Sequence, residues 1–320
     1  MPTTTAPAPS QSRGALVGIA YKVASVLVFL VMSSLLKACD GIPTGELVLF
    51  RSLFGIPPVI AFVAWQGGLR QLFITHSVVG QIWRGLVGTA SMWLGFYALA
   101  ALPLPESVTL NYATPLMIVV VGALFMGETV RLYRWSAVVV GFIGVVVIAW
   151  PQLTLQQSGI DNEALLGIGA ALAACVCAAV AMLLVRQLVQ RERSSTIVIY
   201  FLISSTIIAA LTLPFGWVTP TALQVACLVG AGLCGGIAQV LLTEGYRHGE
   251  MSVVAPFEYT SLIFSVLIGF FFFGDVPTWF MLIGGLIVVA SGLFIIFREH
   301  QLGKNTAKAS EAREAVTPQG

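Results

Sequence analysis

Long apolar blocks, each of about twenty residues, follow one another along most of the 320-residue sequence. A helix needs about 20 mostly apolar residues to cross the hydrocarbon layer of a membrane. Hydrophobic residues make up 58% of the chain and charged residues 9%, so a soluble domain of this composition could not cover its surface with polar groups. The pattern predicts an all-α integral membrane protein with ten transmembrane helices, at residues 15–36, 45–65, 79–101, 106–126, 133–150, 164–186, 196–213, 221–243, 252–273 and 277–297.

Helices are expected rather than strands because every backbone amide in lipid must be satisfied within its own segment or in a closed barrel. Barrel strands would alternate polar and apolar residues over about ten positions, and residues 283–296 do not alternate. Residues 1–13 and 301–320 are polar or small and rich in Pro, Ala or Ser. We therefore expect disordered tails at both ends of the sequence.

Lysine and arginine are divided unevenly between alternate connections, and short cytoplasmic loops retain positive charge. One set of connections contains only Lys37. The other set contains Arg13, Arg70, Arg84, Arg131, Arg134, Arg186, Arg191, Arg193, Arg247, Arg298, Lys304, Lys308 and Arg313. This imbalance predicts a multi-pass protein of a bacterial-type cell inner membrane with both termini in the cytoplasm, which requires an even number of spans.

The second half of the sequence repeats features of the first, in residues 14–151 and 164–298, with five expected helices in each. The matched positions are Gly18-Ile19-Ala20 with Gly167-Ile168-Gly169, Asn111-Tyr112 with Glu258-Tyr259, and Gly127-Glu128 with Gly274-Asp275. Because five is an odd number, the second copy must enter the membrane from the opposite side. Inverted repeats are typical of secondary transporters, whose binding site lies near the midplane where the halves meet. Chance alignment of apolar helices is the alternative interpretation.

The sequence resembles the drug/metabolite transporter (DMT) superfamily, specifically its EamA-type ten-helix transporters, from about Gly14 to Phe297. Besides the repeats, the resemblance rests on Phe50-Arg51, Thr114-Pro115-Leu116, Gly127-Glu128 and Gly274-Asp275. It implies a transporter with a central cavity bounded largely by the third, fourth, eighth and ninth helices. The sequence departs from the family at Asp275, where glutamate is more common, and Pro115 has no aligned proline, its nearest analogue being Pro256.

Glu258 is the first candidate for a functional side chain, because ionisable groups inside spans are costly and usually functional. It is expected about 10 Å from the cytoplasmic face, at 1.5 Å of rise per residue, and its repeat partner Asn111 at a similar depth from the other face. The Glu258 carboxylate could bind a cationic group of a substrate or change its protonation state. A structural ion pair or a polar contact between helices is the alternative.

Two layers of charge are expected, one near each entrance. Lys22 in the first helix is the natural partner of Glu258, and Arg51 is expected to pair with Glu46 or Glu106 near the opposite face. We interpret these layers as alternating gates. The alternative is that Lys22 extends to the membrane interface and that Arg51 only holds helices together.

Aromatic side chains at four positions are candidates for stacking on a planar or cationic substrate, with ordinary packing as the alternative: Trp93, Tyr97, Tyr112 and Tyr259. Pro115 and Pro256 are candidate helix breaks, because proline removes a backbone hydrogen bond and clashes with the preceding turn.

The resulting hypothesis is a secondary transporter, driven by an ion gradient or by exchange, that moves a small metabolite by alternating access. The range implied by the resemblance includes amino-acid derivatives, S-adenosylmethionine-like compounds and riboflavin-like vitamins. A membrane-embedded enzyme is one alternative, but the sequence lacks the common zinc-protease, serine-hydrolase and P-loop motifs. A passive channel is the other, but no filter-like segment is present.

The expected partners are the lipid bilayer, a small-molecule substrate, and a proton or counter-substrate. We expect no cofactor, no metal and no nucleic acid, and the sequence leaves the oligomeric state open.

Overall fold

A computed structural model describes residues 9–126, 132–154, 162–189, 191–248 and 255–316. Every regular element in these residues is helical, and no strand occurs among them. The prediction of an all-α fold is therefore confirmed for the described part of the chain. Gly127-Glu128, the repeat match of Gly274-Asp275, lies outside the described residues.

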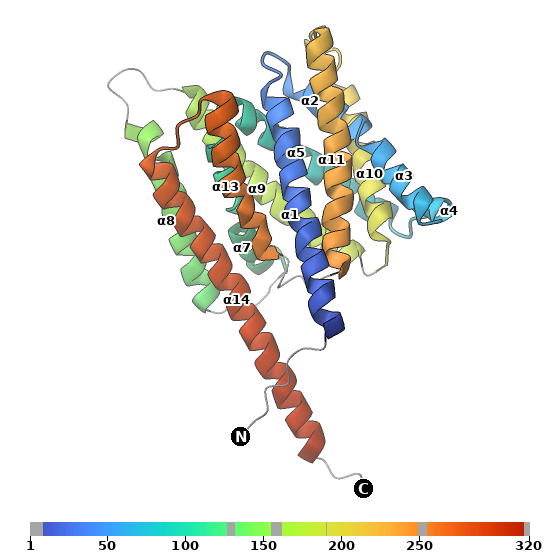
Figure 1. Cartoon of the computed structure of the whole chain (residues 1–320), viewed down its shortest axis with the longest axis vertical. Coiled ribbons are helices and arrows are strands. Elements are labelled where there is room, and N and C mark those ends of the chain that lie inside the picture. Colours follow the sequence, from blue (N-terminus) through green and yellow to red (C-terminus); the bar gives the residue numbers. More distant parts are fainter. Residues whose placement is uncertain (1–8, 127–131, 155–161, 190, 249–254, 317–320) are drawn as a thin grey trace.

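The chain forms a bundle of long helices (Figure 1). Its first half contains α1 (Pro9–Lys37), α2 (Thr44–Leu53), α3 (Ile56–Trp65), α4 (Leu69–Leu72), α5 (Val78–Ala101), α6 (Leu104–Asn111), α7 (Thr114–Met126) and α8 (Leu132–Thr154). Its second half contains α9 (Asn162–Leu188), α10 (Ser194–Ala210), α11 (Ala222–His248), the 3₁₀ helix η1 (Ala255–Tyr259), α13 (Thr260–Ile268), the π-helical turn η2 (Gly269–Phe273) and α14 (Trp279–Val316).

Among the residues that the structure describes, seven segments are long and apolar enough to cross a membrane. They are Leu16–Lys37, Thr44–Trp65, Leu104–Leu124, Leu132–Pro151, Asn162–Val185, Ala222–Gly245 and Trp279–Arg298. Shorter apolar helical segments cover Ser194–Ala210 and Phe257–Phe273. The 24-residue helix α5 is less apolar, since it carries Gln81 and Arg84 near its start. These helices make the chain a multi-pass membrane protein.

Three of the expected spans are interrupted within the structure. A turn at Phe54 and Gly55 separates α2 from α3, and a turn at Tyr112 and Ala113 separates α6 from α7. Pro115 is the second residue of α7, directly after the second break, and Pro256 lies in η1, where the ninth apolar segment is 3₁₀-helical. Pro57 and Pro58 likewise stand near the start of α3, directly after the first break. Proline therefore explains all three irregularities, because it cannot donate the backbone hydrogen bond of a regular helix.

The terminal helices extend further than the sequence predicts. α1 begins at Pro9 and α14 continues to Val316, so the tails predicted to be disordered at 1–13 and 301–320 are helical over the parts that the structure describes. For α14 the physical reason is the composition of the segment beyond Lys304. It is rich in alanine, lysine, glutamate and arginine, the residues of highest helix propensity, so it continues a helix that is already nucleated.

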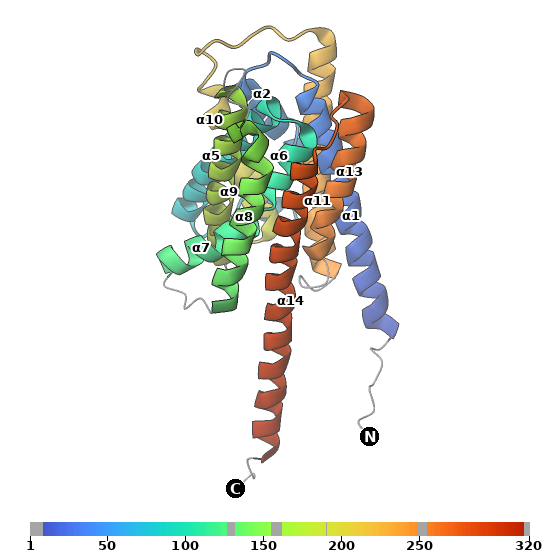
Figure 2. The ribbon, with the colours of Figure 1, turned by 90° about the vertical axis from the view of Figure 1, so that its left-hand side faces the viewer.

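Long helices pack in pairs that join the two halves of the chain. α1 packs along α11, α5 along α9, and α8 along α14. α1 begins at the lower end of the bundle in Figure 1 and α9 at the upper end, and α14 ends at the lower end, as Figure 2 also shows. One apolar cluster joins α5 to α9 around Leu110 and Cys175, and a second joins α1, α2 and α11 around Val48 and Leu228.

The Glu192 carboxylate joins the α9–α10 connection to the α4–α5 connection at the lower end of the bundle. Glu192, between α9 and α10, accepts hydrogen bonds from the Thr75 hydroxyl (2.7 Å) and from the backbone N–H groups of His76 (2.6 Å) and Ser77 (2.9 Å). Burial alone would raise the pKa of Glu192, but these hydrogen bonds stabilise the charged form and bring its pKa below the ordinary value.

Replacing Glu192 with glutamine is expected to lower the free energy of unfolding by about 1–2 kcal/mol at neutral pH, because the bonds to a charged acceptor become bonds to a neutral one. The lowered pKa means that the advantage of wild type is complete above the ordinary carboxyl pKa of about 4.3. It is lost as the pH falls through the still lower value in the folded protein. Thermal unfolding in detergent at several pH values measures this, with Asp40→Asn on an exposed turn as the control. If the difference in the free energy of unfolding between wild type and Glu192→Gln stays constant from pH 8 to pH 3, the charge of Glu192 does not stabilise the fold.

Candidate functional site

An ion pair joins the two halves of the chain near the lower end of the bundle. The ammonium group of Lys22, on α1, donates to the carboxylate of Glu258, on η1. Lys22 lies six residues after Leu16, where the first span begins, which corresponds to about 9 Å into the membrane. The Lys22 side chain is 1% exposed and that of Glu258 is 51% exposed. The contact expected from the sequence is therefore present, and its role as a gate remains a prediction.

Two tyrosines lie beside this pair and connect the same segment to the first half. Tyr112, at the break between α6 and α7, shares a hydrogen bond with the hydroxyl of Ser261 on α13. Its ring centroid lies 5.0 Å from that of Tyr259. The Tyr259 hydroxyl is buried and has no hydrogen-bond partner among the described residues. Glu258, Tyr259 and Tyr112 thus form a single cluster, which we call the inner cluster together with Lys22 and Ser261.

The structure places the remaining expected substrate residues outside the inner cluster. Trp93 on α5 packs against α2, where a side chain at Gly45 would overlap its ring, and it belongs to the apolar cluster around Val48. Tyr97, one turn further along α5, is 36% exposed. Asn111 ends α6 with an exposed side chain next to Tyr112.

The expected pairing of Arg51 with Glu46 or Glu106 is wrong. The Arg51 guanidinium carbon lies 5.8 Å from the centroid of the Phe201 ring, and among the described residues Nε and Nη1 of Arg51 have no hydrogen-bond partner. Glu46 instead lies near the backbone N–H of Val218. The physical reason is helical geometry: at 3.6 residues per turn, positions five apart point in directions about 140° different, so Glu46 and Arg51 face different neighbours.

A second group of charges occupies the upper end of the bundle, and we call it the outer cluster. The Lys37 ammonium group, at the end of α1, donates to the backbone carbonyl of Leu102 (2.6 Å) and to that of Leu99 (3.4 Å). The carboxylates of Asp275 and Glu106 lie within electrostatic range of this ammonium group. The outer cluster therefore contains Glu106, as expected, but its cation is Lys37 rather than Arg51.

Asp275 is positioned by the end of the ninth apolar segment. Gly274 has a φ of 69°, in the left-handed region that glycine adopts readily, and it closes the preceding helix with a hydrogen bond from its N–H to the Gly269 carbonyl. The next residue, Asp275, then accepts a hydrogen bond from the Leu104 N–H (3.1 Å) at the start of α6. The helix thus stops at Gly274. Sequence reasoning missed the outer cluster, although Lys37 was the one cation assigned to its face.

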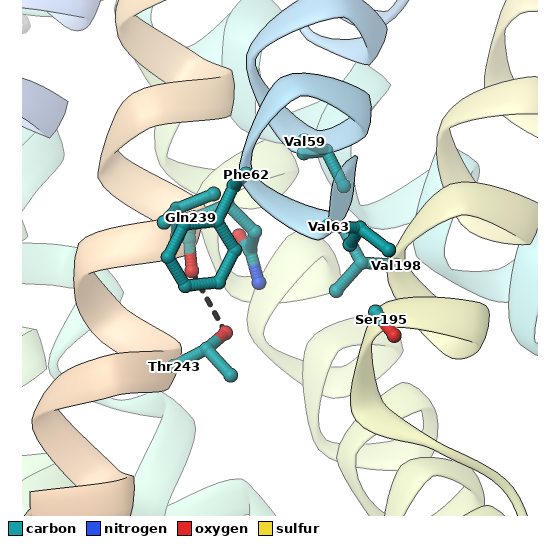
Figure 3. A pocket seen from close by; sticks show the side chains of 8 residues that line it. Val59, Phe62, Val63, Ser195, Val198, Gln239 and Thr243 are labelled. Atoms are coloured by element: carbon teal, nitrogen blue, oxygen red, sulfur yellow. Dashed lines mark hydrogen bonds between the residues drawn. The ribbon is translucent and has the colours of Figure 1, made fainter. Parts of the chain in front are cut away.

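An apolar hollow lies elsewhere, between α3, α10 and α11 (Figure 3). Its walls are formed by Val59, Phe62, Val63, Ser195, Val198, Gln239, Val240 and Thr243. The Thr243 hydroxyl donates to the Gln239 carbonyl at 2.8 Å within α11, as the dashed line in Figure 3 marks. None of the substrate residues expected from the sequence lines this hollow.

Comparison with known proteins identifies transporters with similar sequences. Residues 12–150 and 165–297 match the model of the EamA-like transporter family. The pseudopaline exporter of Pseudomonas aeruginosa is 30% identical over 280 residues, which cover 86% of this chain and 94% of the relative. The riboflavin transporter of Rhizobium johnstonii is 32% identical over 256 residues, which cover 76% of this chain and 82% of the relative.

More distant relatives extend the comparison. The S-adenosylmethionine uptake transporter of Rickettsia bellii is 25% identical over 254 residues, which cover 79% of this chain and 84% of the relative. A crystal structure of 20% sequence identity has a TM-score of 0.62 and covers 91% of this chain and 99% of that chain, which shows a shared fold.

The chain belongs to the EamA-like transporter family, within the drug/metabolite transporter superfamily. It is accordingly a multi-pass inner-membrane transporter of small metabolites, in contact with the lipid bilayer and with a small-molecule substrate.

The unequal exposure of Lys22 and Glu258 predicts unequal effects of removing either charge. Glu258→Gln removes a carboxylate that contacts the buried Lys22 ammonium group and is expected to lower the free energy of unfolding by about 1.5–3 kcal/mol. Lys22→Met leaves a half-exposed carboxylate and should have a smaller effect. The double variant should regain part of the stability, because no uncompensated charge remains. Thermal unfolding of the four proteins in detergent tests this, and purely additive losses would show that the two groups do not interact.

Proposed function

We propose that this protein is a secondary transporter that moves its solute by alternating access between two inverted halves of five spans each, residues 14–151 and 164–298. The two separate family matches support the repeat. The packing of the helices supports it as well: exchanging the halves turns the α1–α11 pair into the α9–α5 pair, and both are extensive contacts. The opposite starting ends of α1 and α9 support the inversion.

The proposal comprises ten spans: the seven long apolar segments, the two shorter ones and α5. It also places both termini in the cytoplasm. Support comes from the distribution of Lys and Arg along the sequence and from the positions of the start of α1 and the end of α14 at the same end of the bundle. The inner cluster then lies near the cytoplasmic face and the outer cluster near the opposite face.

The Lys22–Glu258 pair is the observation that carries the proposed mechanism. It holds η1 of the second half against α1 of the first, and the outer cluster holds α6 of the first half against the end of η2 in the second. Each cluster bridges the halves at one end, so breaking one while the other remains formed opens a single entrance. Once separated from Lys22, the Glu258 carboxylate is available to a proton or to a cationic group of the solute.

The residues around Glu258 supply the other parts of the proposed cycle. Tyr112 and Tyr259 offer ring faces for a planar or cationic solute, and Asn111 offers an exposed amide beside them. Trp93 and Tyr97 remain proposed contacts on α5. Pro115 and Pro256 mark irregular backbone next to the inner cluster, where a small rotation of one half against the other requires few hydrogen bonds to change.

For the substrate we propose a small metabolite such as an amino-acid derivative, an S-adenosylmethionine-like compound or a vitamin-like compound, carried without chemical conversion. The printed functions of the relatives, which include a riboflavin transporter and an S-adenosylmethionine uptake transporter, support this range. Exchange or an ion gradient would drive transport, since the sequence has no P-loop for a nucleotide.

The test is exchange of labelled solute in proteoliposomes that contain the full-length protein. Riboflavin, S-adenosylmethionine and the solutes whose cellular levels change on overexpression are the probes. Wild type should show saturable exchange, and Glu258→Gln should reduce the rate by about tenfold or more, because one charged interaction of the gate is lost. Lys22→Met should also slow exchange.

Asp40→Asn and Arg70→Gln, at exposed positions outside both clusters, should exchange solute like wild type. Size-exclusion profiles check that every variant is folded at the assay temperature. Flux that does not saturate would favour a channel, and chemical conversion of the solute would favour an enzyme. Wild-type exchange rates in both Glu258→Gln and Lys22→Met would show that the Lys22–Glu258 pair is not a gate.

A further inference from the structure

Two arginines approach the same aromatic ring inside the bundle. The guanidinium carbon of Arg51, from α2, lies 5.8 Å from the centroid of Phe201 on α10, and that of Arg84, from α5, lies 4.3 Å from the same centroid. Arg51 is only 7% exposed. Arg84 lies within α5, in the third predicted span (79–101), although the charge distribution along the sequence groups it with a cytoplasmic connection.

These cations lack the partners that buried charges normally have. Nε and Nη1 of both arginines have no hydrogen-bond partner among the described residues, and no carboxylate in that part of the chain forms an ion pair with either. Gln81, on α5 three residues before Arg84 and therefore on the same face, is 1% exposed, and both polar atoms of its amide also lack a partner.

The Phe201 ring does not account for this arrangement. A cation–π contact contributes about 0.5–2 kcal/mol, which is less than the several kcal/mol that removing one cation from water costs. Two cations close to each other also repel, and the charge of Arg84 opposes the charge of Arg51 here. An anion between them would offset both costs, and the planar guanidinium group matches the two oxygens of a carboxylate or phosphate.

Two of the helices that form the walls of the apolar hollow in Figure 3 also carry residues close to the arginines. On α10, Val198 of its wall lies three residues before Phe201. On α11, Gln239 lies one turn from Gly235, where a side chain would contact the Nε atom of Arg51. The hollow therefore lies about one helical turn from Phe201 and Gly235, the residues beside the guanidinium groups.

We propose that Arg51 and Arg84 bind an oxyanion group, a carboxylate or a phosphate, of the transported solute. This assignment rests on the proposed transport function and narrows it to solutes that carry such a group. The same geometry would accept a phosphate from a lipid headgroup, so the experiment separates the two sources.

The variants are chosen to remove the site without unfolding the protein. Arg51→Gln and Arg84→Gln remove the charges, and Arg70→Gln at an exposed position is the control. Gly88→Ala keeps every charge, but its methyl group would overlap the end of the Arg84 side chain and press on Phe201, which displaces the flexible guanidinium group. Gly95→Ala on the same helix, where a methyl group meets nothing within 4 Å, is its matched control.

The measurement is the Tm of the full-length protein in detergent with increasing inorganic phosphate or acetate, against chloride at equal ionic strength. Wild type, Arg70→Gln and Gly95→Ala should show a saturable rise of Tm with the oxyanion, as a ligand that binds only the folded state produces. The rise should be lost in Arg51→Gln and Arg84→Gln, and its half-saturation concentration should increase about tenfold in Gly88→Ala, as expected when one charge-assisted hydrogen bond is lost. The same rise in the Arg51→Gln/Arg84→Gln double variant, or no rise in wild type, would overturn the proposal.

Two further comparisons separate the possible outcomes. In nanodiscs, a stabilisation that needs phosphatidylglycerol and is absent in phosphatidylcholine with added phosphate would assign the site to lipid and overturn its assignment to a solute. In proteoliposomes, arginine variants that exchange carboxylate- or phosphate-bearing solutes as well as wild type would also overturn it, while leaving the transporter intact. An oxyanion-dependent rise of Tm in a wild-type protein that exchanges no solute would instead support the site and reject the proposed function.

Discussion

A buried ammonium group within an apolar helix bundle requires a carboxylate beside it, and the Lys22–Glu258 pair meets that requirement across the two halves of the chain. The segment that supplies Glu258 is the least regular in the bundle, since it passes from 3₁₀ to α to π geometry within nineteen residues, 255–273. Such a segment has few internal constraints on its position. Its contacts with Lys22 and Tyr112 therefore determine where it lies.

Charged residues form three groups in the bundle. The inner cluster links α1, η1 and the end of α6; the arginines link α2, α5 and α10; the outer cluster links α1, α6 and the turn after η2. The inner and outer clusters bring cations and carboxylates together, whereas the arginines have no carboxylate partner among the described residues. In the proposed mechanism the inner and outer clusters open in turn, and the solute supplies the anion that the arginines lack.

Prediction from sequence succeeded for features that many residues specify together, such as apolar spans. It also succeeded where two residues share the same depth in the membrane. The apolar blocks predicted the helical segments, and the matching depths of Lys22 and Glu258 predicted their contact. It failed where the direction of a single side chain decided the outcome, as for Arg51, which lies five residues from Glu46 and faces away from it. The break at Phe54 and Gly55 precedes Pro57 and Pro58, a signal that the prediction of one unbroken span did not use. Gly55 also packs closely on α11, where a side chain at Gly236 would overlap the Gly55 carbonyl. The extension of α14 was missed because a polar tail rich in alanine resembles a disordered tail in composition although it favours helix.

The central claim is that the Lys22–Glu258 pair must form and break while solute crosses the membrane. Exchange of labelled solute by the charge-reversed protein, Lys22→Glu with Glu258→Lys, tests it most directly beside the two single reversals. The single reversals place like charges together and should abolish exchange, and the double reversal should restore a measurable part of it because the attraction between α1 and η1 returns. Single reversals that exchange solute at the wild-type rate would contradict the claim.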